Sequence, residues 1–75
     1  MYKRVKLVRH TFPDRPDWLV MDESTPLGTL YYVLDKKDGF ILRNLQTNES
    51  RPVTCYLLDG NGDVGWMPID CFEEI

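Results

Sequence analysis

The last stretch of the chain, residues 64–75, constrains the fold more than any other. An apolar run leads into Pro68, which cannot donate a ladder hydrogen bond and therefore ends a strand or confines it to a sheet edge. Directly upstream, the Asp-Gly-Asn-Gly-Asp sequence of residues 59–63 is typical of a hairpin turn, because Asn and Gly tolerate positive φ. The pattern predicts a hairpin, a proline-ended strand, one short 3-10 turn near Ile69–Cys71 and a short terminal strand.

The rest of the sequence predicts an all-β domain. No segment shows the three-to-four-residue apolar repeat of a helix, whereas short β-branched and aromatic runs alternate with turn residues. Seventy-five residues form one domain, 1–75, which buries only about 60% of the surface of its unfolded chain. We expect a small antiparallel barrel of five to six strands. The expected strands lie near residues 5–12, 29–34, 40–45, 53–58 and 64–68, with a loop that begins at 13–17 and extends past Glu23, and polar turns at 35–39 and 46–50.

Charge is unevenly distributed along the chain. The net charge is −3, but four of the nine basic residues fall in the first ten positions, and all twelve acidic residues lie after them. Such a charge dipole suits a protein partner, whereas a nucleic-acid binder usually carries a basic excess. The basic residues among the first ten positions are interpreted first as the solvent face of an edge strand. The alternative is a phosphate-facing strip made of Lys3, Arg4, Lys6, Arg9 and Arg43.

The sequence offers weak candidates for chemistry. Asp59, Asn61 and Asp63 have the alternate spacing of calcium ligands, but the glycine and glutamate that such a loop needs are missing, so a hairpin turn explains them. Cys55 and Cys71 lack the spacing of a zinc or redox motif. A disulfide would require their Cα atoms to lie within about 7 Å, and burial as free thiols is the preferred interpretation.

No enzymatic function is predicted. His10 could activate a cysteine thiol, but nothing nearby indicates an oxyanion hole, and a solvent-facing strand histidine is expected instead. No metal and no cofactor are expected. The chain has no apolar run long enough for a membrane span or a signal peptide, and a cytoplasmic protein with reduced thiols is expected.

The C-terminal third resembles the Src-homology-3 (SH3) family. Residues 55–74 align without a gap on the family pattern, with Asn61-Gly62 on the distal turn and Gly65-Trp66-Met67-Pro68 on the strand that enters the one-turn helix. Upstream, residues 7–11 have the spacing of the family's Ala-Leu-Tyr-Asp-Tyr motif, and residues 19–21 correspond to a returning apolar triplet. The resemblance covers about two thirds of the chain and implies a divergent SH3-like barrel.

The departures from that family bear on function. At the positions of the groove aromatics, which bind proline-rich peptides, this chain has Arg9, Thr11, Cys55 and Cys71, and only Pro68 is retained. Ordinary proline-rich recognition is therefore not expected. The acidic loop residues Asp14, Asp17, Asp22 and Glu23 match in character the loop by which the family selects ligand arginines. Residues 35–52 look like an inserted hairpin, which either carries a function of its own or merely extends the sheet.

These observations lead to one preferred function and one alternative. The preferred function is a small non-enzymatic module that binds or modulates a larger protein as an adaptor or inhibitor, an economy that would suit a phage or mobile-element protein. One tryptophan is expected in the core and one at the interface. The expected partner-binding residues are Trp18, Trp66, Asp14, Asp17 and Pro68. The alternative is a nucleic-acid-binding barrel that uses the basic strip of the N-terminal strand. No membrane partner is expected.

Overall fold

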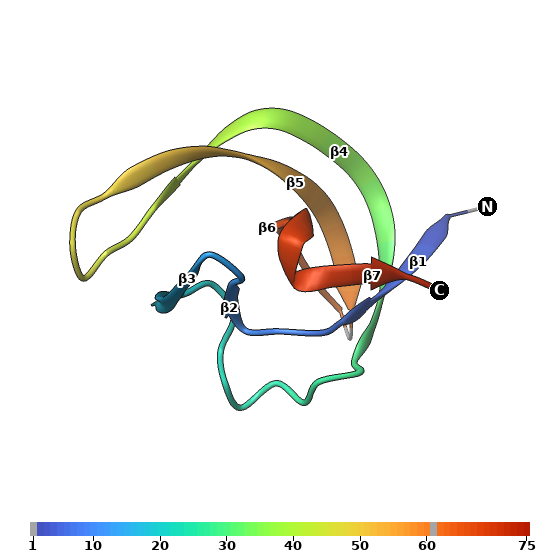
Figure 1. Ribbon diagram of the computed structural model, residues 1–75. Helices are drawn as coiled ribbons and strands as arrows, with labels where there is room; N and C mark the ends of the chain where they lie inside the picture. The colour runs from blue at the N-terminus through green and yellow to red at the C-terminus, as the bar shows by residue number, and fades with distance from the viewer. Residues whose placement is uncertain (1, 61) are drawn as a thin grey trace.

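The computed structural model describes residues 2–60 and 62–75, and within these residues the chain is all-β with a single 3-10 turn (Figure 1). The prediction of an all-β chain with one 3-10 turn is therefore confirmed. These residues form seven strands instead of five to six, because the expected first strand is divided in two, the expected loop contributes one strand, and two expected strands are joined into one. The elements are β1 (Lys3–Leu7), β2 (Thr11–Phe12), β3 (Arg15–Leu19), β4 (Leu30–Arg43), β5 (Ser50–Gly60), β6 (Asp63–Pro68), the 3-10 turn η1 (Ile69–Cys71) and β7 (Phe72–Glu74).

Five strands form one antiparallel sheet in the order β6-β5-β4-β1-β7, and β2 and β3 pair separately. The sheet curves strongly, and η1 carries the chain from one edge strand, β6, to the other, β7. Among the described residues these two edges do not pair with each other, so the hydrogen bonding does not close a barrel.

The N-terminal strand lies inside the sheet, so the expectation that it is an edge strand is wrong. Val5 lies between Tyr31 of β4 and Glu74 of β7. The two true edges are β6 and β7. Residues of β1 alternate between buried Val5 and Leu7 and exposed Arg4 and Lys6, which is the pattern of a sheet with one buried face. Arg4 and Lys6 thus mark the solvent face of an interior strand.

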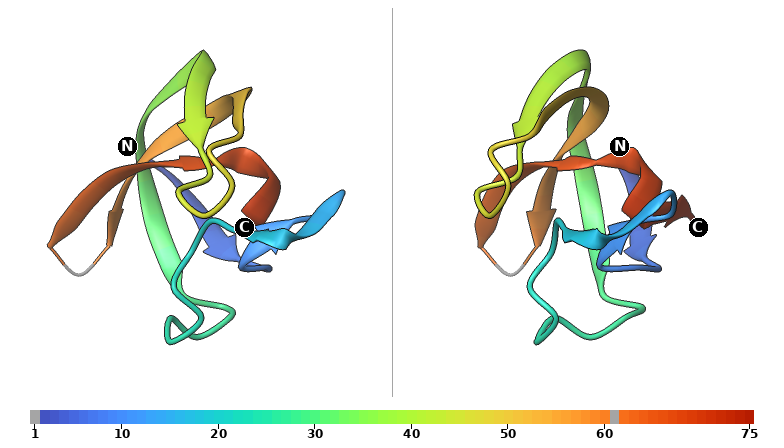
Figure 2. Two further views of the ribbon diagram at one scale, coloured as in Figure 1. Left: turned by 90° about the vertical axis from the view of Figure 1, so that its left-hand side faces the viewer. Right: turned by 60° about the vertical axis from the view of Figure 1, so that its left-hand side comes forward.

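The polar segment 35–39 does not turn the chain. β4 runs through it as one strand of 14 residues, with pairing irregularities between Val33 and Asp35 and between Lys37 and Phe40. Gly39, at φ 70°, takes up the second irregularity without the strain a side chain would add there. The reversal comes only at residues 44–49, where Asn48 adopts φ 61° and its amide donates to the carbonyl of Asn44. The expected inserted hairpin is thus an outward continuation of β4 and β5, which arches over the molecule (Figure 2).

The segment expected to be an irregular loop, 13–17, instead forms the turn and the start of a two-stranded hairpin. Phe12 pairs with Arg15 and Thr11 with Leu19. Pro16 is tolerated because the ribbon has only two strands, so one side of β3 needs no ladder partner.

The main core lies between the sheet and the returning loop. Its buried members are Val5, Leu7, Tyr56, Leu58, Cys71 and Phe72, with Met67 among the half-buried residues packed against them. Met67 therefore faces the core. The predicted hairpin between β5 and β6 also forms, with Gly60 opposite Asp63, whereas Asn61 of the turn and of the calcium pattern lies outside the described residues.

Helical structure in the described part of the chain is confined to η1, and no helix there is long and apolar enough to cross a membrane.

Candidate functional site

Two arginines join the β2–β3 hairpin to the tip of the β4–β5 hairpin. The Arg15 guanidinium binds both carboxylate oxygens of Glu49 at 2.7 and 2.9 Å and both of Asp17 at 3.0 Å. From the other side, the Arg51 guanidinium binds both oxygens of Asp14 at 3.1 and 3.3 Å. We call these five residues the arginine latch. Bidentate pairs of this kind fix the orientation of both partners, so the latch sets the position of one hairpin against the other.

The latch lies on a pair of aromatic rings. Phe12 and Trp18 meet edge to face at 5.2 Å between ring centroids. The Arg51 guanidinium lies 4.7 Å from the Phe12 centroid, and that of Arg15 lies 5.7 Å from the Trp18 centroid. Cation and ring attract each other, and the apolar stems of the arginines cover the rings. Trp18 is accordingly only 3% exposed.

The latch changes the protonation of its own acids. The Arg51 hydrogen bond lowers the pKa of Asp14, and Arg15 lowers the pKa values of Asp17 and Glu49 in the same way. All three are thus held as carboxylates down to lower pH than usual. Asp14 and Asp17, expected to meet a partner, are engaged within the chain, as is the ring of Trp18.

Beside the latch, a cleft of about 280 Å³ separates β3 from the tip of the β4–β5 hairpin. We call it the tip cleft. Its apolar lining includes Trp18, Leu19, Val20, Leu42 and Leu45. Leu45 is 84% exposed, the largest exposure among the large hydrophobic residues described, and Leu19 is also exposed. Two bulky aliphatic side chains at the mouth of a cleft form a surface suited to contact with another protein.

The other predicted contact residues lie away from the tip cleft. Trp66 is half-buried and stacks on Phe40 of β4, with 5.7 Å between ring centroids and an angle of 27°. Pro68 is buried at the end of β6, opposite Cys55. The five predicted partner-binding residues therefore do not form one surface: Trp18, Asp14 and Asp17 come together, and Trp66 and Pro68 lie on β6.

No family model matches this chain, and no curated protein or solved structure matches it.

The proposed basic strip is divided by the fold. Arg4 and Lys6 are exposed on one face of β1, opposite Tyr32 and Leu30 of β4. Lys3 is paired with Glu74 at 2.7 Å, and Arg9 donates to the backbone carbonyl of Asp70. Arg43 lies at the far end of β4, in the hairpin tip, where it binds the Asn48 side chain. Acidic neighbours also interrupt the strip, because Glu73 lies opposite Lys6 and Asp59 opposite Tyr32.

Cys55, Cys71 and His10 were the candidates for chemistry in the sequence. Cys55 and Cys71 are buried free thiols, as preferred from the sequence, and burial raises the pKa of each to about 11. His10 is not on a strand, and its Nε2 lies 2.6 Å from the carbonyl oxygen of Thr25, which can only accept, so this nitrogen carries the proton. Within residues 2–60 and 62–75 no three His, Cys, Asp or Glu side chains gather as a metal site.

The main contributors to this region that were not among the predicted site residues are Arg15, Arg51, Glu49, Leu19 and Leu45. Arg51 and Asp14 are 37 residues apart, and Arg15 and Glu49 are 34 apart, so no local spacing links them. Leu45 offered a local clue, because an isolated leucine among turn residues such as Asn44 and Gln46 has no strand face to bury it.

Proposed function

We propose that this chain is a protein-interaction module, a divergent SH3-like barrel that binds a partner protein through the tip cleft. The strand order supports the SH3-like part of the proposal: a two-stranded hairpin lies between β1 and β4, and a 3-10 turn links the two edge strands of the sheet. The buried Cys55 and Pro68 at former groove positions support a binding mode other than proline-rich recognition.

One observation carries the proposal: Leu45 is exposed at the mouth of an apolar cleft whose two walls are fixed to each other by the arginine latch. An exposed aliphatic side chain on a preorganised support can enter a partner's pocket with little further loss of conformational entropy. The interrupted basic strip and the acidic excess of the chain favour a protein partner over nucleic acid.

Replacement of one leucine tests the proposal. Leu45→Ser should abolish capture of the partner from a lysate of the native host, because the central anchor of the contact is lost. The matched control is Leu27→Ser, which removes a leucine that is 58% exposed on another loop and should leave capture unchanged. The measurement is quantitative mass spectrometry of captured proteins. Equal capture by the wild type and both variants would contradict a role for the tip cleft.

A further inference from the structure

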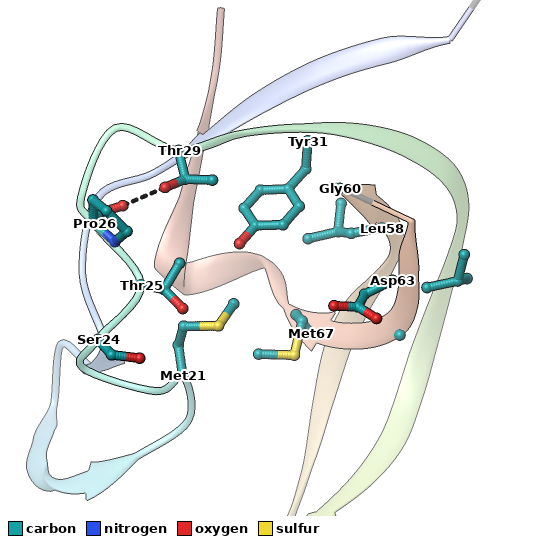
Figure 3. A pocket seen from close by; sticks show the side chains of 12 residues that line it. Met21, Ser24, Thr25, Pro26, Thr29, Tyr31, Leu58, Gly60, Asp63 and Met67 are labelled. Atoms are coloured by element: carbon teal, nitrogen blue, oxygen red, sulfur yellow. Dashed lines mark hydrogen bonds between the residues drawn. The ribbon is translucent and has the colours of Figure 1, made fainter.

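A second hollow, of about 470 Å³, lies between the loop that precedes β4 and the β5–β6 hairpin (Figure 3). Its apolar surface comes mainly from Met21, Tyr31, Leu58 and Met67. Both methionine side chains are partly buried and form part of its floor. Thioethers are flexible and polarisable, so such a floor adapts to an unbranched aliphatic chain.

Two polar groups are directed into this hollow. The carboxylate of Asp63 and the hydroxyl of Tyr31 both point inward in Figure 3. Partial burial, followed by the charge of Asp63, raises the pKa of Tyr31, so its hydroxyl stays neutral. Asp63 takes part in none of the four ion pairs found among residues 2–60 and 62–75. The pocket thus presents one carboxylate with no cation beside it.

The pocket has one charged side chain among its lining residues, that of Asp63. Its lining comes only from two segments, residues 16–35 and 52–75, and neither contains a lysine or an arginine. The first segment carries four acidic residues and the second five. All nine basic residues lie outside these two segments of sequence, and Arg4 and Lys6 of β1 pair with Tyr32 and Leu30, the neighbours of Tyr31. The Asp63 carboxylate therefore gives the pocket a negative charge that attracts a cation.

We propose that this pocket binds a basic side chain, a lysine or an arginine, presented by the partner protein. The aliphatic stem lies against the Met21 and Met67 thioethers and the Tyr31 ring, and the cationic head meets the Asp63 carboxylate. A purely apolar side chain would leave the carboxylate unpaired, and an acidic one would be repelled. This proposal adds a second contact to the proposed function. It rests on that function only in taking the basic side chain to come from a partner protein.

The binding can be tested with small probes and without the partner. N-acetyl-lysine N-methylamide, its arginine analogue and its uncharged norleucine analogue are titrated into the 15N-labelled full chain, and amide shifts are followed by NMR. Saturable shifts centred on Tyr31, Asp63 and Met67 are expected for the basic probes. Their affinity should exceed that of norleucine about threefold, the size typical of an exposed ion pair. Equal affinity for norleucine, or shifts centred elsewhere, would overturn the proposal.

A variant of Asp63 tests whether the negative charge of its carboxylate causes the preference for basic probes. Asp63→Asn should bind the lysine and norleucine probes equally, because the carboxylate is replaced by a neutral amide of the same shape. The matched control, Asp35→Asn, removes an exposed carboxylate of β4 outside the pocket and should keep the preference. A preference that survives in Asp63→Asn would overturn the proposed role of this carboxylate. None of these results depends on the tip cleft, so failure here and failure of the proposed function are distinguishable.

Substitution of two glycines tests whether binding depends on the shape of the pocket. A methyl group at Gly60 would overlap the Tyr31 ring, which must then shift, whereas a methyl group at Gly65 has no atom within 4 Å. Gly60→Ala should therefore weaken the binding of all three probes, and Gly65→Ala should leave it unchanged. Unchanged binding in a folded Gly60→Ala variant would contradict a site against the Tyr31 ring. If that variant does not fold, the Asp63 comparison still decides the question.

Discussion

Two cysteines show how single residues are placed in this fold. Cys55 and Cys71 occupy positions where the resemblance to the SH3 family implies exposed aromatic rings, yet both are fully buried. The Cys71 Sγ lies 3.6 Å from the carbonyl oxygen of Thr11, so it has a hydrogen-bond acceptor within the chain. Both thiols behave as small core side chains, and their burial raises their pKa values from 9.0 to about 11.

This burial predicts unreactive thiols. A rise of two pKa units lowers the thiolate fraction at pH 8 about 100-fold, and burial further blocks access. Ellman's reagent should therefore label neither cysteine of the folded protein within minutes at pH 8, and both at once in denaturant. Absorbance at 412 nm measures the released thiolate. Rapid labelling of the native protein would show that one thiol is exposed or activated.

Among the strands and turns, the sequence predicted those that depend on neighbouring residues and missed those that depend on residues far apart in the chain. The segment from β6 through η1 to β7 was predicted because Pro68, the turn glycines and the period-two pattern act within a few residues. The continuity of β4 was not predicted, because residues 35–39 have the composition of a turn. Only their pairing with β5 keeps these residues extended. The arginine latch was not predictable either, since it joins residues far apart in sequence.

The latch predicts a pH-dependent stability. Arg15 depresses the pKa of Glu49, so the stabilisation is complete above the ordinary carboxyl pKa of about 4 and is lost as pH falls through the lower folded value. Glu49→Gln, which mimics the protonated acid, should lower the melting temperature at pH 7. The difference from wild type should shrink toward zero as pH falls below about 4.

Thermal unfolding followed by circular dichroism between pH 7 and pH 2.5 measures this difference. The control is Glu23→Gln, which removes an exposed carboxylate outside the latch and should change the melting temperature little at any pH. A constant difference between Glu49→Gln and wild type across the whole range would show that the charge of Glu49 is not the source of the stabilisation.

On the scale of the whole molecule, stability depends on the interior strand β1. Its inward residues Val5 and Leu7 are fully buried, and they contact the core from the middle of the sheet. The amide and the carbonyl of Leu7 also hold the loop before β4, through Thr29 and Gly28. A short chain has few other residues that can compensate for a loss at this position.

Truncation of the Leu7 side chain should therefore strongly destabilise the fold. Leu7→Ala should lower the free energy of unfolding by about 2–5 kcal/mol, out of a total of roughly 4–11 kcal/mol for a domain of this size. Leu30→Ala, which truncates an exposed leucine on the neighbouring strand, should cost less than about 1 kcal/mol. Urea unfolding followed by tryptophan fluorescence gives both values. Similar losses for the two variants would contradict the placement of Leu7 in the core.

The pairing of β1 with β7 places the two ends of the described chain side by side, with Lys3 ion-paired to Glu74 and the Ile75 amide donating to the Arg4 carbonyl. Figure 1 shows these ends on one side of the molecule and the β4–β5 hairpin reaching toward the other. Such a geometry permits grafting of the whole module into a loop of a host protein, since entry and exit points coincide. In a chimera of that kind, the hairpin tip would project away from the host.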